Sequence, residues 1–146
     1  MVNTDPIATG YITLERNIVG LNPREIEGVL GLRAGELTTA GARILVLKRQ
    51  PSVGEFAFAG STWYPGAKGL VSLQDRRNCP IPNAWLHQRL VKVRANVQYP
   101  SHDDYPRSAS PVEQWQLLSE IPAEWVCTLV GDKPYWPVRV KDRTTR

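Results

Sequence analysis

Proline and glycine interrupt this chain at short intervals, and their spacing limits what it can fold into. Twelve prolines and eleven glycines are spread through its 146 residues. Proline stops helices and is excluded from the middle of sheets, while glycine favours turns. The chain is therefore predicted to form many short elements joined by turns, and a bundle of long helices is excluded.

A short helix is predicted where the sequence reads NPREIEGVLGL, from residue 22 onward. Asn22 can cap the helix, Pro23 suits its first position, and Glu25 can reach back to the cap. Gly31 can end it in a left-handed conformation. This is the one clear helix that the sequence predicts, and it lies near the N-terminus.

Alternating or continuous apolar runs predict strands elsewhere. The first predicted strand follows Gly10 and holds Arg16 near its end. Residues 89–99 alternate between apolar and polar residues, so Lys92 and Arg94 are expected on one solvent-facing side. Residues 42–49 are almost continuously apolar, which is typical of a strand covered on both faces. Further strands are predicted at residues 54–60, 70–75, 112–118, 124–130 and 135–142. The fold class is a β-rich α+β domain with about six to eight short strands in its sheet.

The length and ordinary composition fit one domain over residues 1–146, with 42% apolar and 22% charged residues. A chain of this size can bury a core without disulfide support. Residues 100–111 are polar and bounded by prolines, so we expect a flexible loop there. We expect a basic tail at about residues 141–146.

Charge and cysteine usage narrow the partners and the compartment. A formal charge of +4 favours an anionic or phosphate-bearing partner. Cys79 and Cys127 are far apart and form no zinc-binding pattern, so we expect two reduced thiols and no metal. No signal-peptide pattern is present, and no apolar run approaches the ~18 residues that span a membrane. The protein is expected in the cytoplasm, or delivered into the cytoplasm of a target cell, without a membrane partner.

Candidate site residues occur in a fixed order along the chain. Arg16 comes late in the first predicted strand, and the aromatic run FAFAG leads into Ser61 and Thr62, followed by Trp63 and Tyr64. Glu113 follows in SPVEQWQLL. A hydroxyl pair at the end of a strand, beside large rings, is suited to holding a small polar ligand.

This order resembles the Arg / Ser-Thr-Ser / Glu layout of the ADP-ribosyltransferases. The resemblance implies that NAD is the substrate and that Arg16 anchors its diphosphate. It also implies that Ser61 and Thr62 brace the nicotinamide-ribose pocket, and that Trp63 or Tyr64 stacks on nicotinamide. Glu113 would be the catalytic carboxylate, because an oxocarbenium-like transition state is stabilised by a nearby negative charge.

The sequence departs from that family at two positions. Trp63 stands where the third residue of the Ser-Thr-Ser motif is expected, and Trp115 stands where the family has its catalytic glutamate. Glu113 or another acid such as Glu120 would then take over, or the site would hydrolyse NAD without transfer. The stretch GLVSLQDRRNCPIPNAWL, with its PIPxxL turn, resembles segments of small ADP-ribosyltransferase-like toxins used between bacteria. A protein or nucleic-acid target and a cognate immunity protein are the partners that this resemblance implies.

Two other functions remain open from the residues. The first is a metal-independent ribonuclease toxin, with His102 or His87 as general base and Lys92 and Arg94 gripping phosphates. Serine-nucleophile chemistry has little support, because the chain has 2 histidines and no G-x-S-x-G motif.

The second alternative function is that of a non-enzymatic binding or immunity module with an exposed aromatic surface. That surface would be formed by Trp63, Trp85, Trp115 and Tyr135.

Overall fold

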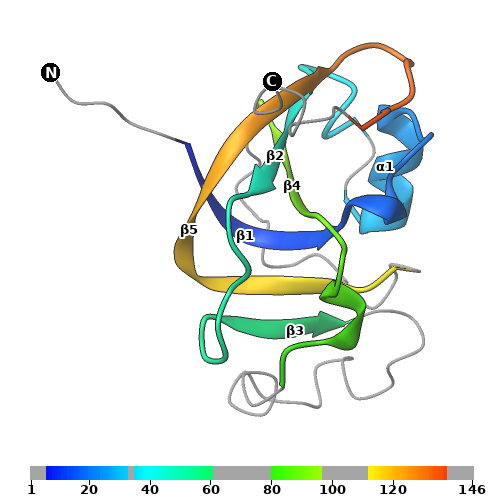
Figure 1. Cartoon of the computed structure of the whole chain (residues 1–146). Coiled ribbons are helices and arrows are strands. Elements are labelled where there is room, and N and C mark those ends of the chain that lie inside the picture. The colour runs from blue at the N-terminus through cyan, green and yellow to red at the C-terminus, as the bar shows by residue number, and fades with distance from the viewer. Residues whose placement is uncertain (1–5, 33–34, 61–79, 97–111, 138–146) are drawn as a thin grey trace, which may run out of the picture.

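The computed structural model describes residues 6–32, 35–60, 80–96 and 112–137 (Figure 1). It contains one α-helix and several β-strands in this part of the chain, which confirms a β-rich α+β fold. The expected loop at residues 100–111, the tail at 141–146 and the predicted strand at 70–75 lie outside the described residues. The elements are β1 (Ile7–Leu14), the 3₁₀ helix η1 (Glu15–Asn17), α1 (Pro23–Leu30), β2 (Ala42–Leu47), β3 (Phe56–Gly60), the 3₁₀ helix η3 (Asn83–Trp85), β4 (Leu90–Ala95) and β5 (Gln114–Leu129).

The strands form an antiparallel sheet that closes on itself. Its order is β1-β4-β2-β5-β3, and β1 also pairs with β5. The ring β1-β4-β2-β5 is therefore a closed barrel, and β3 extends it from the side of β5. Among the described strands, the pairing of β1 with both β4 and β5 closes the ring, and β3 pairs with β5 alone.

β5 corrects the prediction of two separate strands at residues 112–118 and 124–130. It is one strand of 16 residues, and it turns sharply through its middle (Figure 1). Its first half pairs with β1 and β3, and its second half pairs with β2. Pro122 lies where the partner changes, and its carbonyl accepts from the backbone N–H of Lys48 at 2.8 Å. The proline does not break the strand, because it stands at the bend between two pairing regions.

Helix α1 begins and ends as predicted. The Asn22 side chain accepts from the backbone N–H of Glu25, and the Glu25 carboxylate accepts from that of Asn22, both at 2.9 Å. Gly31 follows with a φ of 71°, the left-handed conformation that glycine adopts without strain. Buried Glu27 then accepts from the backbone N–H groups of Leu37 and Thr38 at 2.7 and 2.9 Å. This carboxylate ties the turn after the helix to the helix itself.

The core consists of two apolar clusters that share strand β2. One contains Leu45 and Leu47 with the aromatic residues Phe56, Trp85 and Trp115. The other contains Ala42 and Ile44 and packs against the buried face of α1. Alternate residues of β2 thus enter different clusters, which confirms that this strand is covered on both faces.

The chain after β5 does not form the strand predicted at 135–142, as far as it is described. Tyr135 exchanges backbone hydrogen bonds with Gly20 and Leu21, at 2.7 and 2.8 Å, and is buried. These bonds dock the segment beside the entry to α1, so it is held there rather than in the sheet. Residues beyond Pro137 lie outside the described part. None of the described helices has the length and apolar character needed to cross a membrane.

Candidate functional site

Arg16 lies beyond the first strand and not within it, which corrects its predicted position. β1 ends at Leu14, and Arg16 is an exposed residue of η1. The cause is Glu15, which turns inward and is only 9% exposed. The chain therefore leaves the strand geometry after Leu14, and the Arg16 side chain is at the surface.

Three contacts hold Glu15 in that inward position. Its backbone N–H donates to the carbonyl of Arg89 at 2.9 Å. Its carboxylate accepts from the Arg89 guanidinium at 2.9 Å and from the Tyr135 hydroxyl at 2.5 Å. Burial, followed by the hydrogen bond to Glu15, raises the pKa of Tyr135. Tyr135 therefore stays a neutral donor at physiological pH, and the network fixes the turn that carries Arg16.

Cys127 lies close enough to this network to be affected by its charge. It is a free, half-buried thiol. Burial and the Glu15 carboxylate both raise its pKa. A raised pKa lowers the thiolate fraction, so Cys127 is poorly suited to act as a nucleophile.

Glu113 is half-buried and directly precedes β5. Its backbone carbonyl accepts from the Thr13 hydroxyl at 2.8 Å, and that hydroxyl accepts from the Asn17 side chain at 3.0 Å. Thr13 precedes η1 and Asn17 is its last residue. A chain of hydrogen bonds thus joins the turn that carries Arg16 to the backbone of Glu113.

The end of β3 lies beside the same residues. Gly60 pairs with Gln114, and Gln114 pairs with Thr13 on its other side. Ser61, Thr62, Trp63 and Tyr64, which follow Gly60, lie outside the described residues. The register therefore brings the end of β1, the start of β5 and the end of β3 together at one edge of the sheet.

The groups required by the ribonuclease alternative are partly described. His87 is exposed and has a φ of 62°, and His102 lies outside the described residues. Lys92 and Arg94 are both half-buried. Arg94 donates to the carbonyl of Ile7 at 2.9 Å. That bond gives Arg94 a structural role at the start of β1.

The binding-module alternative predicts an exposed aromatic surface, and this prediction is wrong for the three of its residues that the structure describes. Trp85, Trp115 and Tyr135 are 0%, 2% and 1% exposed. The Trp85 ring contacts Phe56 and Trp115, with ring centroids 4.7 and 5.3 Å apart. Trp63 lies outside the described residues. Aromatic rings of this size stabilise a core when they are buried together, as Phe56, Trp85 and Trp115 are here.

Trp125, an exposed tryptophan on β5, is not among the site residues predicted from the sequence. Its ring is 38% exposed and lies under two guanidinium groups. The central carbons of Arg43 and Arg94 are 4.9 and 5.4 Å from the ring centroid. Alternation along β2 and β4 distinguishes these arginines from the apolar residues beside them. That the two arginines meet over Trp125 follows only from the strand register.

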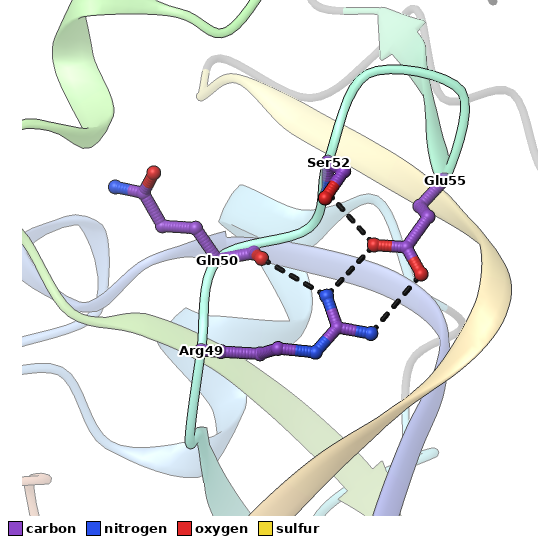
Figure 2. A network of polar contacts seen from close by, with 4 residues as sticks. All are labelled: Arg49, Gln50, Ser52 and Glu55. Carbon is purple, nitrogen blue, oxygen red and sulfur yellow. Dashed lines mark hydrogen bonds and ion pairs between the residues drawn. The ribbon is translucent and has the colours of Figure 1, made fainter.

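Arg49 is paired in a different way, through a local ion pair in the connection between β2 and β3 (Figure 2). Its guanidinium donates two hydrogen bonds to the Glu55 carboxylate, at 2.8 and 3.0 Å. The backbone N–H of Ser52 donates to the same carboxylate at 2.8 Å. The Arg49 hydrogen bond, with that of Ser52, lowers the pKa of Glu55 to about 2. These contacts close the turn between the strands.

An open depression of about 450 Å³ is lined by Asn22, Arg24, Thr38, Gly131 and Asp132. None of the predicted site residues is among them. In the described ranges, no cluster of three or more His, Cys, Asp or Glu residues is suited to hold a metal ion. The place where β1, β3 and β5 meet therefore remains the candidate site, because Arg16, Gly60 and Glu113 lie at or next to the strand ends that converge there.

Comparison with known proteins gives no family for this chain. No family model matches it, and no curated protein and no solved structure matches it significantly. The function must therefore be argued from the residues of the chain itself.

Proposed function

We propose that this protein is an ADP-ribosyltransferase-like toxin domain that consumes NAD, by ADP-ribosyl transfer or by hydrolysis. The observation that carries the proposal is the hydrogen bond from the Thr13 hydroxyl to the Glu113 carbonyl, 2.8 Å long. It joins two segments that are 100 residues apart in the sequence. These are the segments on which the resemblance puts the arginine and the glutamate.

The exposure and charge of Arg16 suit it to bind a diphosphate. Its side chain is exposed on a turn that Glu15, Arg89 and Tyr135 hold in place. Within the described residues, Arg16 forms no ion pair that would compete for its guanidinium. A guanidinium binds phosphate oxygens in a bidentate manner, so Arg16 would anchor the NAD diphosphate.

Glu113 would supply the negative charge at the reacting carbon. The bond between the ribose carbon and the nicotinamide nitrogen breaks, and its electron pair goes to the nitrogen, which becomes neutral. Positive charge develops on the ribose, and a carboxylate nearby stabilises it. A water molecule or a nucleophile of the target then attacks the same carbon and loses its proton. Ser61, Thr62, Trp63 and Tyr64 would form the nicotinamide-ribose pocket beside it.

The test is incubation of the pure protein with NAD, with free nicotinamide measured by chromatography. We expect nicotinamide release by the wild type and a higher thermal midpoint in the presence of NAD. Glu113→Gln keeps the shape of the side chain and removes its charge. This variant should lose about 100-fold or more in rate while its NAD-free midpoint stays unchanged, as for removal of an electrostatic stabiliser.

Glu120→Gln tests the other acid that the sequence offers for this role, because Glu120 is an exposed carboxylate on the same strand. It should release nicotinamide at the wild-type rate. Loss of activity in Glu120→Gln but not in Glu113→Gln would contradict the role of Glu113. Absence of both nicotinamide release and stabilisation by NAD in the wild type would discard the proposal.

As a toxin of this kind, the protein would act in the cytoplasm of a target cell. A protein or a nucleic acid would accept the transferred group, and a cognate immunity protein would protect the producing cell. Mass spectrometry of target-cell lysates after incubation with labelled NAD would identify the acceptor by its added ADP-ribose.

A further inference from the structure

Two arginines face each other across neighbouring strands of the barrel. Arg43 of β2 is directly paired with Arg94 of β4 in the strand register. Like charges in directly opposed positions destabilise a sheet. Such a pair therefore needs a compensating interaction.

No carboxylate provides that compensation within the described residues. Ion pairs there join Arg49 to Glu55 and Arg89 to Glu15, and neither Arg43 nor Arg94 takes part in one. Arg43 and Arg94 instead share the ring of Trp125. A cation above an exposed aromatic ring is attracted only weakly, so the described residues leave the positive potential at this place largely uncompensated.

The arginines differ in how firmly they are held. Arg94 is half-buried, and its guanidinium donates to the carbonyl of Ile7 at 2.9 Å. Arg43 is exposed, and in the described part of the chain its guanidinium lies over the Trp125 ring and makes no hydrogen bond or ion pair. Arg94 therefore fixes the geometry, and Arg43 keeps its donors available for a ligand.

The ring of Trp125 adds an aromatic surface to this pair of cations. Its exposed fraction of 38% leaves part of the indole accessible. Aromatic rings beside arginines bind single-stranded nucleic acids, because the bases stack on the ring while the phosphates meet the guanidinium groups. A free phosphate would use the guanidinium groups alone and would leave the ring unused.

We propose that Arg43, Arg94 and Trp125 form a binding surface for single-stranded nucleic acid. Arg43 contacts a phosphodiester, Trp125 contacts an adjacent base, and Arg94 positions the ring and adds positive charge. This surface is separate from the proposed NAD site. Arg94 bonds to Ile7 at the start of β1, whereas Thr13 and Glu113 meet at its end. Ile7 and Thr13 are six residues apart in β1, which corresponds to about 20 Å at ~3.3 Å per residue.

The experiment measures fluorescence anisotropy of an end-labelled, non-self-complementary oligonucleotide of about 12 nucleotides, a length within the range of single-strand sites. RNA and DNA forms are titrated with the full chain over a series of chloride concentrations. Arg43→Gln should weaken binding at least about fivefold and reduce the slope of log affinity against log salt by about 0.7, the value for one lost phosphate contact. Trp125→Leu should weaken binding at least about fivefold with the slope unchanged, because stacking releases no counterions.

Arg24→Gln is the matched control, since it removes the same charge from an exposed residue of α1. α1 packs in the cluster that contains Ala42 and Ile44, so it lies on the opposite face of β2 from Arg43. Arg24→Gln should bind within about twofold of wild type, a loss of non-specific attraction only. Thermal unfolding of each variant checks that the fold is intact.

Three results would overturn the proposal. The first is equal weakening by Arg43→Gln and Arg24→Gln, which would mean a general effect of net charge. The second is tighter binding of a duplex of the same length than of the single strand, which would remove the role of the exposed ring. The third is displacement of the oligonucleotide by inorganic phosphate at constant ionic strength, which would indicate a site for free phosphate.

Discussion

Arg89 and Arg43 belong to neighbouring parts of the sheet, one just before β4 and the other on β2, and their surroundings differ sharply. Arg89 directly precedes β4 and donates to the buried carboxylate of Glu15, which also accepts from Tyr135. Arg43 is exposed on β2, faces another arginine, and has a tryptophan ring as its contact. Arg89, which is half-buried, is neutralised by a buried carboxylate, whereas Arg43 has no carboxylate partner among the described residues.

The difference teaches which cations of a basic protein can serve a ligand. An arginine that is bonded to a buried carboxylate is committed to the fold, because removing either partner leaves a buried charge. An exposed arginine without a carboxylate partner contributes little to the fold. The net charge of +4 therefore does not show where a ligand binds, because arginines paired with carboxylates and arginines without such partners are counted alike in it. Substitutions at Glu15, Glu55 and Arg43 test this difference between paired and exposed arginines.

Glu15→Ala should have the largest effect. It leaves the Arg89 guanidinium and the Tyr135 hydroxyl without their shared acceptor, and loss of one member of a buried pair costs about 3 kcal/mol of unfolding free energy. Urea unfolding followed by fluorescence measures it. Tyr135→Phe is the companion variant, because it removes one donor and keeps the ring, and it should cost about 1.5 kcal/mol. Values below about 0.5 kcal/mol for both variants would mean that the network does not stabilise the fold.

Glu55→Gln should have an intermediate effect that depends on pH. The pKa of Glu55 is lowered to about 2 in the folded protein, so its ionised form is favoured by folding. Stability from this group is present above the unfolded pKa of about 4.3 and is lost as the pH falls through about 2. Thermal midpoints of wild type and Glu55→Gln should therefore differ at pH 6 and converge toward pH 2. A difference that is constant over that range contradicts the assignment.

Arg43→Gln should have the smallest effect on stability. It removes a weak cation–ring contact and also relieves the repulsion with Arg94, so the unfolding free energy should stay within about 0.5 kcal/mol of wild type. Any gain should shrink in high salt, which screens exposed charges. A loss of more than about 1 kcal/mol of unfolding free energy would mean that Arg43 stabilises the fold as Arg89 does.

Local features of the fold were predictable, and features that depend on remote contacts were not. Asn22, Glu25 and Gly31 act within one short segment, so the helix and both of its ends follow from the sequence. The position of Arg16 was missed because Glu15 is drawn inward by Arg89 and Tyr135, which are 74 and 120 residues away. No periodicity of the first strand encodes that contact.

The candidate site shows the same limit. The order of Arg16 and Glu113 along the chain was visible, but the bond between Thr13 and Glu113 depends on how β1 and β5 pair. The tryptophans were also misjudged. Trp85 and Trp115 are buried together with Phe56, whereas Trp125 is exposed where β5 changes its register against β2. A bulge of this kind redirects side chains, and the alternation pattern cannot reveal it.

The length and position of β5 determine when the barrel can close during synthesis. β5 pairs with β1, β2 and β3, and it emerges from the ribosome after all of them. Among the described strands, only the pairs that β4 makes with β1 and β2 can form before β5 appears. The nascent chain therefore carries unpaired strand edges until a late stage, which slows folding and favours self-association. Ribosome-bound intermediates of this protein are expected to depend on chaperones until residue 129 is free.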